Sequence, residues 1–196
     1  MSKKSIILIA LGVIVLAVGV FMYRSYNSMV ANDEAVSTAW GNLQSQYQRR
    51  ADLVPNLVNT VKGYAKHESS TLEAVVNARA KATQVTVSTD QLTPEKLKQI
   101  QAAQGEFSQA LSRLLAITEN YPDLKANENF SELQTQLEGT ENRINESRQL
   151  YNESVRKYNL SVRTFPRNVV ASMYGFETKS MFEADAQAQK APEVQF

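Results

Sequence analysis

Cysteine is absent from the 196-residue sequence, and histidine and tryptophan each occur only once. The absence of cysteine excludes disulfide bonds, thiolate metal ligands, cysteine nucleophiles and a lipid anchor attached to cysteine. Glycine and proline are scarce, with seven and five residues, which favours long helices over strands joined by turns. The 21 basic and 20 acidic residues nearly cancel, so the charge gives no reason to expect nucleic-acid binding. The composition therefore indicates an all-α protein with no nucleic-acid partner.

A long apolar segment, residues 5–22, precedes the rest of the chain. It holds no charged residue and no proline. As a helix its 18 residues span about 27 Å, close to the roughly 30 Å hydrocarbon core of a bilayer. We predict a single transmembrane helix over residues 5–23, in contact with the lipid bilayer. Its predicted membrane-spanning side chains are Ile6, Ile7, Leu8, Ile9, Leu11, Val13, Ile14, Val15, Leu16, Val18, Val20 and Phe21.

The same segment has an alternative interpretation as a cleaved signal peptide. Two lysines precede it, and the small residues Ala17 and Gly19 resemble a cleavage site. The apolar run is longer than the roughly 7–15 residues usual in a signal peptide, which favours an uncleaved anchor. The two lysines outnumber Arg24 just after the segment, so the positive-inside rule puts residues 1–4 in the cytoplasm. The bulk of the chain is then expected on the opposite, non-cytoplasmic side of the membrane.

Beyond the anchor, apolar residues recur at spacings of three and four, a pattern typical of amphipathic helices. Pro55 lies within the first such pattern. We expect a kink or a local distortion there rather than a break, because Val58 and Val61 continue the apolar stripe in register. The patterns predict helices over residues 23–66, 70–85, 94–121, 127–165 and 168–174.

Local signals mark several of these helix ends. Ser70 begins a capping box, and Thr93, followed by proline, suits the start of the third helix. Gly175 suits the end of the last helix. Residues 86–92 are polar and β-branched, so we expect a loop there. Residues 184–196 lack periodicity, and we expect a mobile tail.

Four long helices joined by short connections bury their stripes best as an elongated antiparallel four-helix bundle. We therefore predict one domain over residues 24–183, in which the fourth helix returns towards the membrane. Val162 near its end should lie level with Val36 and Trp40. Residues 165–182 should then lie at the membrane-proximal end, where their large apolar side chains either pack on Trp40 or contact lipid headgroups. Packing is favoured because the segment is short and its charges are mixed.

Two stretches of the sequence resemble the signature regions of the LemA family. The first is residues 39–68, AWGNLQSQYQRRADLVPNLVNTVKGYAKHE, and the second is residues 121–168, YPDLKANENFSELQTQLEGTENRINESRQLYNESVRKYNLSVRTFPRN. Gly175-Phe176 and Phe182-Glu183 continue the likeness, which covers nearly the whole chain. The resemblance implies a single-pass membrane protein with a helical-bundle domain, and it does not imply an enzyme. The family's members look like scaffolding or accessory proteins of the bacterial envelope.

Few side chains could carry chemistry. His67 is the single histidine, and one imidazole beside exposed acids at a turn is a weak ligand set for a metal ion. We therefore predict no metal site and no cofactor. The sequence offers no nucleophile with a nearby base, so we predict that the protein is not an enzyme.

Several polar side chains are candidates for contacts between helices or between molecules. For Arg49 and Arg50 the favoured interpretation is a solvated face with a local contact to Asp52, worth about 0.3–0.5 kcal/mol. The alternative is a salt bridge to another molecule, or to Glu141 or Glu146 across the bundle. The predicted protein–protein contacts are Arg49, Arg50, Asn142, Asn145, Tyr151 and Tyr158.

Together these features predict a membrane-anchored, non-enzymatic scaffold that self-associates or supports another envelope protein. The second helix, about 22 Å long, is too short to cover the first, which is about 60 Å long. Part of the first helix's stripe is therefore left to the fourth helix or to neighbouring copies. The alternative function is a membrane-tethered sensor domain for a small molecule or peptide. An apolar cavity between helices would favour the sensor, and continuous close packing would favour the scaffold.

Overall fold

The computed structural model describes residues 2–65, 67–84 and 87–183, and all regular structure within these ranges is helical. The all-α class and the long apolar N-terminal helix are therefore confirmed. The expected tail, residues 184–196, lies outside the described residues. The elements in chain order are α1 (Lys3–Tyr64), α2 (Ser69–Gln84), the short 3-10 helix η1 (Thr89–Gln91), α3 (Pro94–Thr118), α4 (Pro122–Lys125), α5 (Glu128–Arg163) and α6 (Arg167–Tyr174).

Helix α1 is one uninterrupted element of 62 residues, about 93 Å long. The apolar segment thus continues into the first helix of the domain without a linker. Residues 23–34 contain no glycine or proline, so the sequence predicts this continuity. Pro55 lies inside α1 without ending it. A proline removes one backbone hydrogen bond, and the buried side chains of Val54, Leu57 and Val61 around it hold the helix in place.

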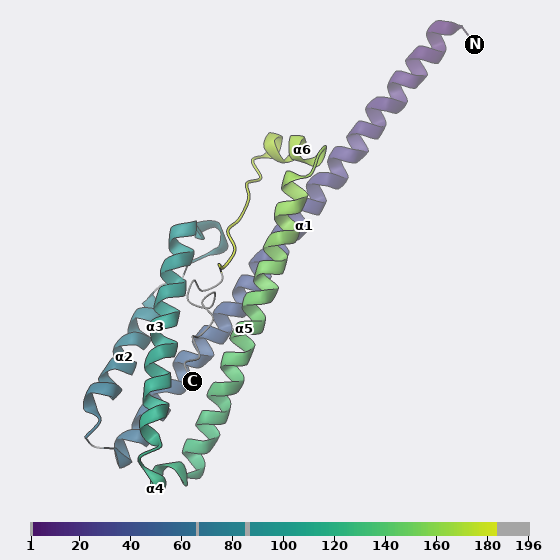
Figure 1. The fold of residues 1–196 in the computed structure, drawn as a ribbon. Coiled ribbons are helices and arrows are strands. Elements are labelled where there is room, and N and C mark those ends of the chain that lie inside the picture. The colour runs from purple at the N-terminus through teal and green to yellow at the C-terminus, as the bar shows by residue number, and fades with distance from the viewer. Residues whose placement is uncertain (1, 66, 85–86, 184–196) are drawn as a thin grey trace, which may run out of the picture.

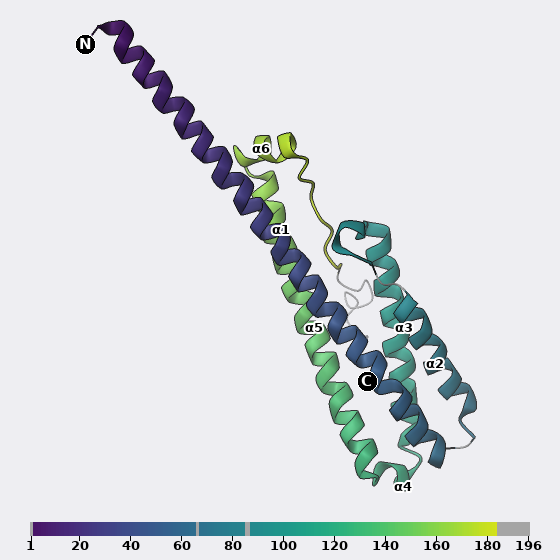
Figure 2. The ribbon, with the colours of Figure 1, turned by 180° about the vertical axis from the view of Figure 1, so that it is seen from behind.

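The helices pack as antiparallel neighbours (Figures 1 and 2). Helix α5 runs back along α1, and α2 and α3 form a second pair beside the half of α1 that is far from the N-terminus. The short connections require this arrangement, because a helix that follows after a few residues must reverse direction. Helix α5 therefore covers the part of α1 that α2 is too short to reach.

The register of α5 on α1 differs from the sequence-based expectation. The Trp40 ring lies 5.6 Å from the Tyr151 ring, and Arg50, ten residues after Trp40, pairs with Glu141, ten residues before Tyr151. Val162, eleven residues after Tyr151, therefore lies level with Met29, eleven residues before Trp40, and not with Val36 or Trp40. The predicted direction of α5 was correct, but its predicted level was wrong by two helical turns, because periodicity reports which face is buried and not how far one helix slides along another.

Two apolar clusters form the core. The cluster near the apolar N-terminal segment joins α1, α3, α5 and α6, and includes Trp40, Leu97, Tyr151 and Val170. The far cluster draws on α1, α2, α3, α4 and α5. The predicted stripes of α3 and α5 are largely buried, with Leu97, Ile100, Phe107, Leu111 and Leu114 on α3 and Phe130, Leu137, Ile144, Tyr151, Val155, Tyr158 and Val162 on α5.

The spacing of Leu72, Val76 and Ala80 predicts that these residues of α2 face inward, and this prediction was wrong in part. Leu72 is buried, but Val76 is 47% exposed and Ala80 is exposed, whereas Val75 and Ala78 are buried. The helix is rich in alanine, so its hydrophobic pattern distinguishes the two faces poorly, and contact with α3 decides which residues are covered.

The caps of α3, α5 and α6 match the sequence. Thr93 Oγ1 accepts the N–H of Lys96 at 3.3 Å, Asn127 caps α5, and Gly175 ends α6 with φ +74°. The predicted role of Ser70 was wrong, because α2 already begins at Ser69.

The remaining connections contain short helical turns. The expected loop holds η1, and α4, which the sequence did not predict, forms one turn before α5 because Pro122 suits the first position of a helix. After α6, residues 176–183 run back along α5 outside any helix. We call these residues the strap.

Candidate functional site

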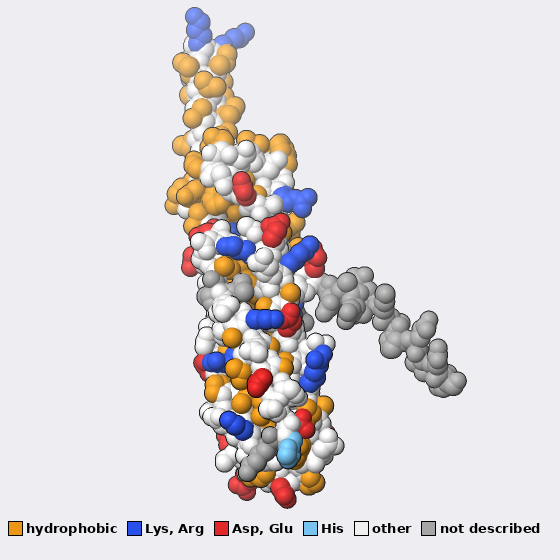
Figure 3. All heavy atoms as spheres, turned by 90° about the vertical axis from the view of Figure 1, so that its left-hand side faces the viewer, with side chains coloured by type: hydrophobic (Ala, Val, Ile, Leu, Met, Phe, Trp, Pro, Cys, Tyr) orange, Lys and Arg blue, Asp and Glu red, His pale blue; other side chains and the backbone are white. Residues whose placement is uncertain are grey.

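The apolar anchor of α1 is exposed on every side. All twelve predicted membrane-spanning side chains are exposed, from 37% at Phe21 to 69% at Leu16. Figure 3 shows hydrophobic side chains covering this rod, with basic side chains only at its tip. Among the described residues, α1 is the one helix long and apolar enough to cross a bilayer. An unburied apolar surface of this length needs a hydrocarbon environment or a partner.

A ring of exposed apolar side chains follows directly after the anchor. The Tyr26 ring on α1 lies 4.9 Å from Tyr174 and 5.7 Å from Phe176, which holds α6 against α1. Tyr26 is four residues beyond Met22, or about 6 Å along the helix, a distance that matches the headgroup layer of roughly 5–8 Å on each side of the hydrocarbon core. We call the exposed side chains around this level the apolar collar: Tyr23, Tyr26, Phe165, Val169, Met173 and Tyr174.

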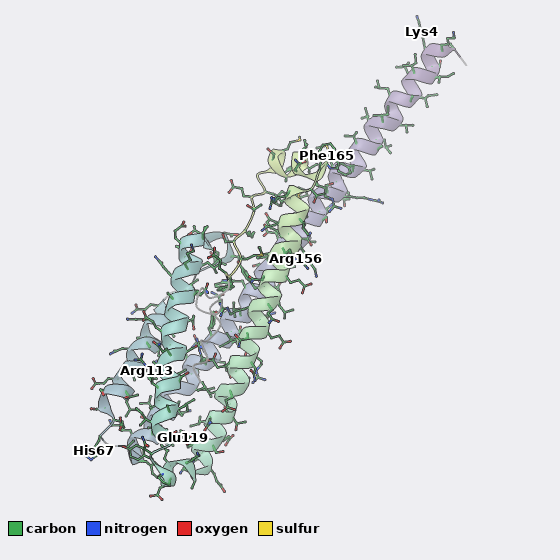
Figure 4. All side chains as sticks on the ribbon, in the orientation of Figure 1. Lys4, His67, Arg113, Glu119, Arg156 and Phe165 are labelled. Atoms are coloured by element: carbon green, nitrogen blue, oxygen red, sulfur yellow. The ribbon has the colours of Figure 1, made fainter. Side chains whose placement is uncertain are left out.

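Residues 165–174 lie at the anchor end of the domain, as predicted (Figure 4), whereas the strap carries Phe182 back along α5 to the level of Trp40. Some of the apolar side chains of residues 165–182 pack in the core, and others are exposed, as contact with lipid headgroups would require. Phe182 stacks 6.4 Å from Trp40 in the core, whereas Val169 and Met173 are 53% and 64% exposed. Packing on Trp40 is therefore confirmed for Phe182, and contact of the collar with headgroups stays a prediction.

A buried arginine connects three helices in the middle of the domain. Arg50 of α1 is 1% exposed, and its Nη1 donates to Glu141 Oε1 of α5 at 2.6 Å and to Ser108 Oγ of α3 at 2.7 Å. Its Nη2 donates to Gln104 of α3. The guanidinium also lies 4.8 Å from the ring centre of Phe107. The salt bridge across the helices, which the sequence left as the less favoured alternative, is thus present.

The neighbouring side chains have a different character. Arg49 is exposed, and Asp52 accepts a hydrogen bond from Gln48 at 2.7 Å, so the favoured interpretation of a solvated face holds for this part of the helix. Burial raises the pKa of the Tyr47 hydroxyl, and the positive charges of Arg148 and Arg50 oppose that rise. The phenol therefore stays neutral beside the buried ion pair at neutral pH.

The other predicted contact residues fall into two groups. Asn142 and Asn145 are exposed, like Arg49, and their contact with another protein stays a prediction. Tyr151 and Tyr158 are buried in the chain's own core, and burial raises the pKa of each hydroxyl to about 12.

Sequence analysis missed the function of two other side chains on α5. Asn152 and Asn159 each hold the backbone of the strap. The signal was present in the sequence, because the pair Tyr-Asn occurs twice at an interval of seven residues, at 151–152 and 158–159.

The far end of the domain carries the single histidine (Figure 4). His67 is exposed in the turn between α1 and α2. Within residues 2–65, 67–84 and 87–183, no group of three or more histidine, aspartate or glutamate side chains is placed to hold a metal ion.

One pocket opens between α1, α2 and α3. It has a volume of about 290 Å³, and its wall mixes aromatic and amide side chains, including Trp40, Gln44, Tyr47, Gln104 and Phe107. This size lies at the lower end of pockets that bind small molecules, which are roughly 300–1,000 Å³.

Comparison with known proteins gives one family and several relatives. The model of the LemA family matches residues 39–196. Magnetosome protein MamQ 2 of Paramagnetospirillum magneticum is 26% identical over 175 residues, which cover 81% of this chain and 64% of the relative. Protein LemA of Metamycoplasma hominis is 25% identical over 174 residues, which cover 87% of this chain and 75% of the relative. The chain thus spans less than two thirds of the length of the magnetosome relative.

Proposed function

Because the chain belongs to the LemA family, we propose that it is a membrane-anchored, non-enzymatic scaffold that binds further copies of itself or supports another membrane protein of the bacterial envelope. The observation that carries this proposal is the continuity of α1, which joins the apolar anchor to the far end of the domain as one helix. A linker would let the domain move freely, whereas a continuous helix holds it at a fixed distance from its anchor.

The proposal treats α1, α2, α3 and α5 as one elongated four-helix bundle. Its support is the far apolar cluster, to which all four helices contribute buried side chains. The buried contacts of Arg50 with α3 and α5 support the same view. Such packing leaves the outer faces of the helices free for partners.

We further propose an inner-membrane location, with the N-terminus in the cytoplasm and the bundle in the periplasm. The lysines at positions 3 and 4, against Arg24 alone on the other side, support this orientation. In that arrangement the apolar collar meets the headgroup layer. Its tyrosines suit this interface, because a phenol presents an apolar ring and a polar hydroxyl.

The exposed surface near the middle of the bundle is the proposed contact between copies. Arg49 and Asn142 lie at the same level of the α1–α5 pair, since their neighbours Arg50 and Glu141 form the salt bridge. Asn145 is exposed one turn further along α5. These three polar side chains can form hydrogen bonds between bundles that stand side by side.

The pocket beside Trp40 supports the second candidate, a membrane-tethered sensor. Aromatic walls with a few amide groups are typical of ligand sites. A ligand there would change the fluorescence of Trp40, the single tryptophan in the sequence.

Light scattering of the full chain in detergent tests the scaffold. We expect oligomers, and we expect the triple change Arg49→Ala, Asn142→Ala and Asn145→Ala to shift them towards monomers. Asn77→Ala, at an exposed position of α2, is the matched control and should leave the oligomers intact. Monomers of the wild-type chain at every concentration, with native Trp40 fluorescence, would refute self-association.

A further inference from the structure

The strap is held at two of its residues through the backbone. It leaves α6 at Gly175 and runs between α5 and the start of α3 (Figure 1). Asn159 of α5 accepts the N–H of Lys179 at 2.8 Å and donates to the C=O of the same residue at 2.9 Å. Asn152 repeats this pair of bonds with Phe182, at 2.9 and 3.1 Å.

The distance between Asn152 and Asn159 along α5 matches the distance between Phe182 and Lys179 along the strap. Asn152 and Asn159 are seven residues apart, two turns of α5, which separates them by about 10.5 Å on one face. Lys179 and Phe182 are three residues apart, and three residues of extended chain also span about 10 Å. Asn152 and Asn159 can therefore both reach the backbone of residues three apart in an extended peptide that runs antiparallel to α5, as they do at Lys179 and Phe182. Tyr151 adds a bond from its hydroxyl to the C=O of Ser180 at 3.1 Å.

Beside α5 and α3, two side chains of the strap, Lys179 and Phe182, make specific contacts, while Phe176 packs on Tyr26 next to α6. The Phe182 ring is 7% exposed and lies 5.4 Å from the Tyr151 ring, with the Arg148 guanidinium 4.8 Å from its centre. The Nζ of Lys179 lies 2.5 Å from Asp33 Oδ1. Between these positions, Met181 is 45% exposed.

We propose that this groove of α1, α3 and α5 is a peptide-binding site, and that the strap is its resident competitor. Its ligand class is an extended segment of a partner protein with a cationic residue followed three positions later by an aromatic one. Bonds to the peptide backbone provide affinity for any sequence, whereas contacts with the cationic and the aromatic side chain provide specificity. A tail that only covered the core would need the buried ring, but it would not need two asparagines matched to its backbone.

The strap can leave the groove without unfolding its neighbour. Gly175 joins it to α6 at a single point, and α6 keeps its own contacts with α1 through the buried Val170 and Ala171 and through Tyr174 on Tyr26. A competing peptide would therefore replace contacts of equal kind while the helices stay in place.

Binding of a synthetic peptide tests the proposal. The probe has the sequence of residues 176–183, FETKSMFE, with both ends blocked and a fluorescent label. The receptor is the full chain in detergent with Lys179→Ala and Phe182→Ala, which weaken its own strap. We expect this receptor to bind the probe at least tenfold more tightly than the wild-type chain does. Added changes Asn152→Ala and Asn159→Ala should reduce the affinity at least tenfold, whereas Asn129→Ala, at an exposed position near the start of the same helix, should not.

Hydrogen exchange of the wild-type chain gives a second measurement that needs no variant. Added probe should speed the exchange of the amides of Lys179 and Phe182 and leave those of α5 unchanged. The proposal is overturned if the probe binds neither receptor, if binding ignores the two asparagines, or if the strap amides exchange as slowly as α5 whether or not the probe is present.

Discussion

Removing either partner of the Arg50–Glu141 pair should have unequal effects on stability. Arg50 is 1% exposed, whereas the side chain of Glu141 is 34% exposed. After Arg50→Met, the carboxylate can turn to water, and methionine fills much of the space that arginine held. After Glu141→Gln, the guanidinium stays buried without a negative partner. The free energy of unfolding should therefore fall more for the change at the better exposed residue.

The expected magnitudes follow from the cost of a buried charge. Removing one partner of a buried ion pair costs about 3–5 kcal/mol when the other charge cannot reach water. Ser108 and Gln104 still accept hydrogen bonds from Arg50, so we expect about 3 kcal/mol for Glu141→Gln. For Arg50→Met we expect about 1 kcal/mol or less, because replacing a buried ion by an apolar group is often nearly neutral. In a chain of this size, Glu141→Gln should lower the melting temperature by roughly 6–12 °C, and Arg50→Met should lower it by less than about 4 °C.

Trp40 fluorescence provides the assay, since this single tryptophan packs against Tyr151 and Phe182 in the core. Thermal unfolding of each variant is followed in the same detergent as the wild type. Glu106→Gln is the control, because its contact with Lys81 is exposed on both sides, and it should leave the midpoint within about 2 °C. A larger loss for Arg50→Met than for Glu141→Gln would refute the reasoning.

Two further predictions concern register and alkaline stability. Cysteines at Met29 and Val162 should form a cross-link in the otherwise cysteine-free chain, whereas cysteines at Val36 and Val162 should not. The reverse result would mean that α5 is shifted along α1 by two turns, away from the apolar anchor. Burial raises the pKa of the Tyr151 and Tyr158 hydroxyls to about 12, while the unfolded chain loses these protons near pH 10. The two protonated hydroxyls should therefore contribute fully to the free energy of unfolding below pH 10, and this contribution should be lost between about pH 10 and 12. Urea midpoints that stay level over that range would contradict the burial of the two hydroxyls.

Features decided within one helix could be predicted from the sequence. The stripes of α3 and α5 repeat every three or four residues, so their buried faces follow from local geometry. The cap at Thr93 and the C-terminal glycine at Gly175 depend on neighbours a few residues away. The continuity of α1 follows because residues 23–34 contain nothing that ends a helix.

Features decided between distant segments could not be predicted in the same way. The face of α2 depends on contact with α3, since alanine lies on both of its sides. The strap lacks periodicity, and its position depends on Asn152 and Asn159, whose bonds join residues 20 to 30 positions apart. The burial of Arg50 had a similar cause. Its partners Glu141 and Ser108 lie on α5 and α3, and the register of these helices along α1 cannot be read from the sequence.

The error in register explains why a charge lies in this core. A shift of α5 by seven residues, which would bring Val162 level with Val36, keeps the same side chains on the buried face, because seven residues are close to two full turns. Apolar contacts alone therefore discriminate weakly between the two registers. The Arg50–Glu141 pair discriminates strongly, since the shift would separate the charges by about 10 Å and leave the guanidinium buried without its partner. We infer that the pair contributes less to the free energy of unfolding than to the choice of one register, and that it thereby fixes where α6 and the collar lie relative to the anchor.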